Sequence, residues 1–145
     1  MTLATLTRST TALPSRADAP GLRQVGPGWE VLLMPEPLAR LVTRALAGRP
    51  VKVAALGWVF AHAGQWGIFL PEMSDDPAWP PGTTYLAAGG SVTLPPFSRR
   101  SAEDAWGWVR LDGSPLSRPL LLHPVVTALA ADLPPHVSPV LESRP

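Results

Sequence analysis

The stretch WEVLLMPEPLARLVTRALAG (residues 29–48) decides the expected fold, because its hydrophobic pattern changes halfway along. The first six residues form a short apolar run, which is typical of a buried strand. Pro37 then suits the first turn of a helix, since its φ angle is already helical. The apolar residues that follow recur as on one helix face: Leu38, Leu41, Val42, Ala45 and Leu46. The stretch therefore predicts a strand and then a helix over residues 37–47 that packs on a sheet.

Short apolar segments separated by turn residues continue the chain, and we expect them to be strands: 51–56, 58–63, 66–70, 83–88, 91–96 and 106–111. Gly64-Gln65 is expected to be a turn, and Gly89-Gly90 a tight hairpin turn with positive φ. The polar, proline-rich residues 71–82 read as a surface loop. HPVVTALAADL (123–133) predicts a second helix with Pro124 at its start. This order predicts an α+β fold with a small, mostly antiparallel sheet and two packed helices.

A single α+β domain is expected over residues 27–134, between flexible tails at residues 1–26 and 135–145. Residues 1–17 contain two arginines and no acid, which fits a flexible tail and is also seen in transit peptides. The sequence contains no secretory signal and no apolar run long enough for a membrane helix. We therefore expect a cytoplasmic protein without a membrane partner.

The composition excludes several classes of site. The chain has no cysteine, so it cannot form disulfides, thiolate metal sites or cysteine nucleophiles. Its formal net charge is only +1, whereas a duplex-binding surface normally has a clear basic excess. His62, His123 and His136 lack ligand spacing, so no metal site is expected. No nucleophile elbow and no phosphate-binding loop motif occurs.

Glu30 is the one carboxylate inside an expected strand, and the other acids lie mostly in expected loops. It could serve as a catalytic acid, but a solvent-facing strand position is the favoured interpretation. The six tryptophans admit two interpretations as well, core packing or stacking platforms for bases. Core packing is favoured, since the chain has only three Phe and one Tyr. The phosphate-contact hypothesis for Arg99 and Arg100 is weakened by the acids that follow at 103–104.

The succession WEVLLMPEPLARLVTRAL, RPVKVAAL, GQWGIFLPE and GGSVTLPP resembles the actinobacterial bifunctional DNA primase/polymerase (Prim-Pol) domain family. The resemblance covers roughly residues 28–111, about the C-terminal half of a typical family domain. It implies that Gly89 to Pro96 corresponds to the glycine-rich strand beside the family's nucleotide site.

The catalytic groups implied by the resemblance do not carry over. Active members hold divalent metals with two carboxylates that lie one or two residues apart on the first strand. Here Glu30 has no acidic neighbour at residues 31–33. The family's histidine has no counterpart at residues 66–69, and its further acidic position has none near residues 83–85. One carboxylate is too few to hold two six-coordinate cations, so we expect no enzyme activity and no cofactor.

The leading interpretation is a small, non-catalytic protein, a shortened and degenerate relative of the Prim-Pol domain, which binds another protein. The alternative is a nucleotide or single-stranded nucleic-acid binding module. Its candidate binding residues are Trp66, Gly89, Gly90, Arg99, Arg100, Trp106 and Trp108. An enzyme of unrecognised type is the third possibility. A nucleic-acid module should expose a tryptophan beside arginines, whereas a protein-binding module should expose an apolar patch.

Overall fold

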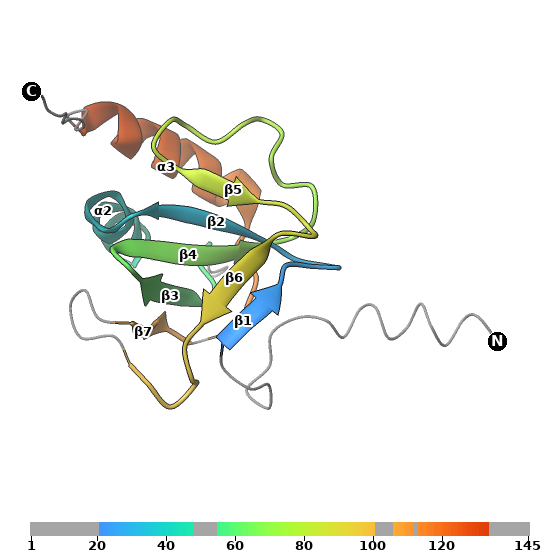
Figure 1. The fold of residues 1–145 in the computed structure, drawn as a ribbon. Helices are drawn as coiled ribbons and strands as arrows, with labels where there is room; N and C mark the ends of the chain where they lie inside the picture. The colour runs from blue at the N-terminus through green and yellow to red at the C-terminus, as the bar shows by residue number, and fades with distance from the viewer. Residues whose placement is uncertain (1–20, 48–54, 101–105, 112, 134–145) are drawn as a thin grey trace, which may run out of the picture.

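A computed structural model of the chain describes residues 21–47, 55–100, 106–111 and 113–133. Its strands are β1 (Gly21–Gln24), β2 (Glu30–Pro35), β3 (Val59–His62), β4 (Gln65–Leu70), β5 (Thr84–Leu86), β6 (Ser91–Leu94) and β7 (Gly107–Arg110). Its helices are α2 (Glu36–Ala47) and α3 (Pro119–Asp132) (Figure 1). The α+β class predicted from the sequence is confirmed, and so is the helix predicted over 37–47.

The middle layer is a five-stranded sheet in the order β5-β2-β4-β3-β7, in which neighbouring strands run antiparallel. β3 and β4 form the hairpin that the sequence predicts. Their turn lies at Ala63 and Gly64, with φ of 54° and 81°, one residue before the expected Gly64-Gln65 turn. Positive φ at both central residues suits the right-handed twist of the flanking strands. Gln65 therefore belongs to β4 and pairs with His62.

The helices cover one face of this sheet and build the first of two hydrophobic cores. Alternate residues of the central strands face them, including Leu32 and Ile68. On α2 the buried residues are Leu38, Ala39, Val42 and Leu46, whereas Leu41 is only half-buried and lies outside this core. The expected packing of Leu41 on the sheet is thus wrong. The periodicity locates an apolar stripe, but which edge of the stripe faces inward depends on how the helix is rotated on the sheet.

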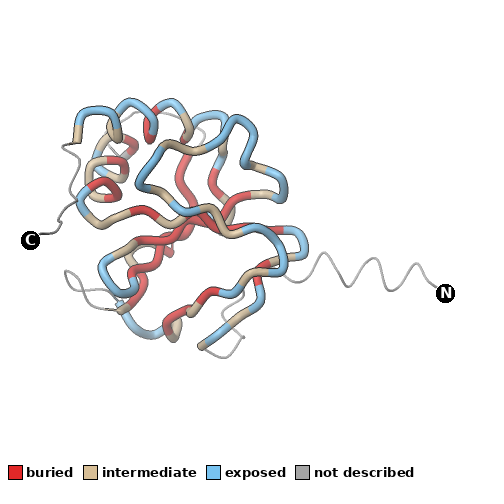
Figure 2. The backbone as a smooth tube through the Cα atoms, turned by 45° about the horizontal axis from the view of Figure 1, so that its top comes forward, coloured by how far each residue is buried: buried red, intermediate tan, exposed pale blue. Residues whose placement is uncertain are grey.

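The second core lies on the opposite face, beneath a two-stranded ribbon formed by β1 and β6. It consists mainly of large aromatic side chains: Trp29, Trp58, Phe60, Phe69, Phe97 and Trp108. Gly67 makes room for them, since a Cβ at this position would lie 2.2 Å from the ring of Phe60. Figure 2 shows that burial is concentrated in the central strands, while the long loop before β5 is largely exposed.

The domain begins earlier than expected. Residues 21–26 were expected to belong to the tail, but Gly21–Gln24 pairs antiparallel with β6, and Val25 is 1% exposed. The four residues GLRQ carry no alternation strong enough to indicate a strand. Their pairing with a distant segment is a tertiary contact. The expected tails at 1–20 and 135–145 lie outside the described residues.

The expected hairpin at Gly89-Gly90 is also wrong. β5 pairs with β2 in the sheet, whereas β6 pairs with β1 in the ribbon. Gly89 has a φ of +100°, and its N–H donates to the Val25 carbonyl at 2.9 Å. Gly90 has no positive φ, and its N–H donates to the Ala87 carbonyl at 3.0 Å. The two glycines form a corner that carries the chain from one layer to the next.

Two smaller expectations change as well. The second helix begins at Pro119, four residues before the expected start, so Pro124 lies inside it. Arg118 is extended and its carbonyl accepts the first backbone bonds, from the N–H groups of Leu121 and Leu122. Of the strand expected at 51–56, residues 51–54 lie outside the described chain, and residues 55–56 are not in a strand. No helix within the described ranges is long and apolar enough to cross a membrane.

The rotation of α2 predicts unequal effects for two truncations on the same helix. Leu38→Ala should lower the free energy of unfolding by about 2–5 kcal/mol, because it leaves a cavity in a fully packed core. Leu41→Ala should cost clearly less, because the side chain is partly exposed and lies outside the core under the helices. Urea unfolding of both variants measures the difference, and equal losses would contradict this helix orientation.

The corner predicts that a side chain at Gly89 destabilises the protein more than one at Gly90. A hairpin centred on Gly90 would predict the reverse. Gly89→Ala should destabilise the protein by roughly 1–3 kcal/mol, because a side chain resists this positive φ. Gly90→Ala should cost less, since its φ is not positive and its Cβ would meet the Ala87 carbonyl at 3.3 Å and the Leu86 Cβ at 4.0 Å. Thermal and urea unfolding of the matched pair test this, and a larger loss in Gly90→Ala would overturn it.

Candidate functional site

The tryptophans singled out in the sequence do not form a joint platform. Trp66 and Trp108 are both buried, at 5% and 1% exposure. Trp66 belongs to the core under the helices and Trp108 to the core under the ribbon, so they lie on opposite faces of the sheet. Neither offers an open indole face to a base. Core packing, the favoured interpretation, describes both positions.

Trp106 has a different environment, because it is half-buried next to the end of β3. Its ring meets the exposed His62 edge-on, with centroids 5.9 Å apart. The guanidinium Nε of Arg99 donates to the Trp106 carbonyl. Arg100 is exposed and forms a parallel bridge with Trp108. Of the candidate binding residues, the structure thus brings Trp106 and Arg99 together, while Gly89 and Gly90 lie at the corner before β6.

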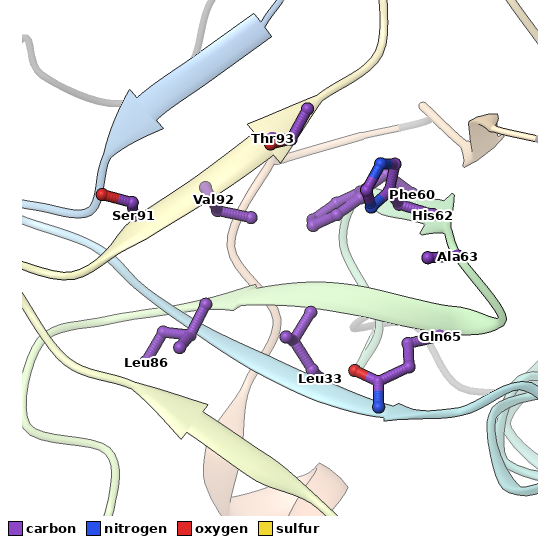
Figure 3. Close-up of a pocket in the computed structure, with 9 residues that line it drawn as sticks. All are labelled: Leu33, Phe60, His62, Ala63, Gln65, Leu86, Ser91, Val92 and Thr93. Atoms are coloured by element: carbon purple, nitrogen blue, oxygen red, sulfur yellow. The ribbon is translucent and has the colours of Figure 1, made fainter.

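A pocket of about 220 Å³ lies near these residues, between β6 and the open face of the sheet. Leu33, Leu86 and Val92 supply apolar walls from three different strands, as Figure 3 shows. The remaining lining residues are Phe60, His62, Ala63, Gln65, Ser91 and Thr93. Phe60 and Val92 are buried, whereas the polar side chains stand at the half-open rim. The pocket therefore has an apolar interior and a polar edge.

The pocket exists because the ribbon is narrower than the sheet beneath it. Strands lie about 4.8 Å apart, so two strands cover only part of a face that is five strands wide. The corner at residues 87–90 sets β6 away from β5, and Leu86 and Leu33 remain beside the gap. The turn at Ala63-Gly64 places His62 and Gln65 at the other end. Rigid elements thus position each wall.

None of the lining residues is among the seven candidate binding residues, although Ser91, Val92 and Thr93 lie in the stretch that the resemblance places beside a nucleotide site. Leu33 lies between Leu32 and Met34 in a continuous apolar run, so the run alone does not separate a core position from a pocket wall. The relevant observation is that Leu33 and Leu86 are only half-buried, although they sit next to a core. That difference arises from the width of the ribbon, a tertiary property.

Glu30 does not face solvent, contrary to the favoured expectation, because its side chain is 6% exposed. Its Oε1 accepts hydrogen bonds from the Met73 N–H at 2.9 Å and from the Tyr85 hydroxyl. Its Oε2 accepts the Ala88 N–H at 2.9 Å. Both oxygens are therefore bonded to the segment between β4 and β6, which includes strand β5. This carboxylate ties β2 to that segment, because both of its oxygens accept hydrogen bonds from the chain's own donors.

These contacts determine the pKa shifts of Glu30 and Tyr85. Burial raises the pKa of Glu30, but the hydrogen bonds from Tyr85, Ala88 and Met73 outweigh it and hold the pKa below its ordinary value of 4.5. Burial and the adjacent Glu30 carboxylate raise the pKa of Tyr85 well above its usual range. The carboxylate is thus stabilised as an anion and the phenol as a neutral donor. Within the described residues, no group of three or more potential ligands could hold a metal ion.

The same loop is tied to α3. The Tyr85 hydroxyl accepts the Ser74 N–H at 3.0 Å, and the Trp79 indole N–H donates to the Ser74 carbonyl at 2.8 Å. His123 on α3 contacts the Ala78 carbonyl through Nε2 at 2.9 Å. Its ring also packs on Trp79, with centroids 4.7 Å apart. The surface loop predicted for 71–82 is therefore fastened at both ends, on the side of the sheet away from the ribbon.

Comparison of the chain with protein-family models, with curated proteins and with solved structures finds no match in any of the three.

Removal of the Glu30 charge should markedly lower the free energy of unfolding. Glu30→Gln puts an amide N–H against one of three chain donors, so we expect a loss of about 2–3 kcal/mol in the free energy of unfolding at pH 7. The exposed Glu72→Gln is the matched control and should change it by less than about 0.5 kcal/mol. Urea unfolding measures both, and equal values would contradict the role of Glu30.

The lowered pKa of Glu30 also makes the stability of the protein depend on pH. The folded protein keeps Glu30 ionised to lower pH than the unfolded chain, so its contribution is complete well above pH 4.5. As the pH falls below 4.5 and through the folded-state pKa, that contribution should be lost. Glu30→Gln should therefore lose less stability than the native protein over the same acid range. Parallel slopes in the two proteins would show that other groups govern the acid response.

Proposed function

We propose that this chain is a non-catalytic binding protein and that its ligand site is the pocket beside β6. The observation that carries the proposal is the combination of an apolar interior, a polar rim and walls taken from rigid strands. Binding sites of folded proteins typically combine apolar walls with a few polar groups that orient the ligand. The nine lining residues include no carboxylate, and their one group suited to acid–base work is His62, which lies exposed at the rim.

The size of the pocket limits what it can hold. Sites for drug-sized ligands measure roughly 300–1,000 Å³, whereas this pocket measures about 220 Å³. It suits one large apolar side chain or a single small aromatic molecule. A side chain presented by another protein fits this limit better than a nucleoside triphosphate, because the pocket lining contains no lysine or arginine to bind its phosphates. We therefore propose a protein partner in the cytoplasm, without a cofactor.

In this proposal the chain is a relative of Prim-Pol domains that no longer carries their catalytic groups. Glu30 is the only acid on β2, and its oxygens are bonded to the chain's own donors. The face of β2 toward the ribbon carries Val31 and Leu33, which join the aromatic core. A shortened relative that has exchanged a charged site for an apolar one fits these positions. The alternative, a nucleic-acid module, would have to rely on Trp106 with Arg99 and Arg100, since Trp66 and Trp108 are buried.

Indole is a suitable probe of the pocket because it is small, rigid and largely apolar. In two-dimensional ¹⁵N–¹H NMR titrations, indole should shift the amide signals of Leu33, Leu86 and Thr93, with a dissociation constant of about 1 mM. Leu86→Trp should fill the pocket and abolish these shifts. Leu120→Trp is the control, because Leu120 is exposed on α3 and outside the pocket.

Two results would contradict the proposal. Indole shifts that survive in Leu86→Trp, or that centre elsewhere, would remove the pocket as the ligand site. Extension of a primed template by the pure protein with Mg²⁺ or Mn²⁺ would overturn its non-catalytic character.

A further inference from the structure

β6 has one unpaired edge, and this edge borders the pocket. The Val25 N–H donates to the Gly90 carbonyl at 2.8 Å, which sets the alternation of bonds along the β1–β6 ladder. In an antiparallel pair, every second residue bonds to its partner and the intervening residues direct their N–H and C=O groups outward. Ser91 and Thr93 are the intervening residues. Their backbone groups point away from β1, and no backbone bond to another part of the described chain engages them.

The edge and the pocket are arranged as a strand-addition site. A third strand on β6 would lie about 4.8 Å farther across the sheet, over the gap that the ribbon leaves uncovered. Side chains of such a strand alternate between the two faces, so one of them would point down between Leu33, Leu86 and Val92. Backbone bonds would then supply affinity and the pocket would supply selectivity.

The charges of the described residues indicate the character of the added strand. The pocket lining contains no acid, and its rim carries His62, which contacts Trp106 and through it Arg99. The exposed acids of the described chain that lie in a loop are Glu72, Asp75 and Asp76, in the loop fastened to α3 on the other side of the sheet. An incoming acidic segment would therefore approach the Arg99 guanidinium and meet no carboxylate in the pocket lining.

We propose that the free edge of β6 captures an extended, acidic segment of a partner protein as the third strand of the ribbon, with one large apolar side chain in the pocket. The proposal rests on the pocket being a ligand site and adds the backbone geometry and the charge of the occupant. It differs from capture of a free small molecule, because the backbone of the partner must contribute hydrogen bonds.

The probe is the peptide acetyl-Glu-Val-Glu-Phe-Glu-Val-amide, followed by NMR on the full chain. It should shift the amide signals of Ser91 and Thr93 together with those of Leu33 and Gln65. Replacing Phe by Ala in the peptide should weaken binding about tenfold, since one buried aromatic ring is lost. Replacing the three Glu by Lys should also weaken it, and the difference should shrink at high salt.

Backbone methylation of the peptide tests strand addition directly. Two further peptides carry N-methyl groups either on the three Glu or on Val, Phe and Val. Alternate amides of an added strand face its partner, so one peptide should lose about tenfold in affinity and the other should bind nearly as before. Equal affinities would overturn strand addition, whereas indole binding to the pocket would remain unaffected.

A matched pair of proline variants tests the same edge from the protein side. Thr93→Pro removes an N–H that points toward the pocket, and Leu22→Pro removes its counterpart on the outer edge of β1. The first should weaken peptide binding and the second should not, with the native spectrum retained in both. If Thr93→Pro unfolds the protein, the methylated peptides still decide the question.

Three outcomes would replace this proposal by another. Shifts of Ser91 and Thr93 that grow with protein concentration alone would assign the edge to a second copy of this chain. Tighter binding of a single-stranded oligonucleotide at the same signals would assign it to nucleic acid. No shift by any peptide of the series at millimolar concentration would remove the edge as a binding site.

Discussion

The arrangement of this domain depends on the buried carboxylate of Glu30. It lies at the start of β2 and accepts hydrogen bonds from the Met73 N–H, from the hydroxyl of Tyr85 in β5 and from the Ala88 N–H. A buried charge is tolerable only with such donors. Because the segment between β4 and β6 is held here, β5 is placed against β2, and the chain reaches the corner from which β6 starts.

The two faces of the sheet are then filled by different means. Aliphatic side chains and two helices complete one face, and the core there is continuous. Six large aromatic side chains fill most of the other face, under a ribbon that is only two strands wide. Close packing normally leaves few voids in a core. A pocket beside a core therefore marks a place that no strand or helix covers. Here the missing cover is the width of about one strand.

The glycines of AAGGSVTLPP connect these features. The resemblance to Prim-Pol domains would make them part of a strand beside a nucleotide, whereas the periodicity would make them a hairpin. In the structure Gly89 lets the chain leave the sheet, and β6 continues in the second layer until Pro95, whose carbonyl accepts the Trp108 indole N–H at 3.0 Å. The same corner opens the gap beside Leu86, so the geometry that makes the ribbon also makes the candidate site.

The sequence by itself determined the elements whose signals are local. These are the apolar run of β2, the stripe and prolines of α2, the hairpin of β3 and β4, and the α+β class. Only the tertiary structure decided the rest: β1 as a partner of β6, the corner at Gly89, the inward position of Glu30 and the edge of α2 that faces the sheet. It also made the pocket, because Leu33 and Leu86 look like core residues in the chain. The physical reason is that local periodicity reports which side chains avoid water, whereas pairing partners and gaps depend on contacts between segments far apart in sequence.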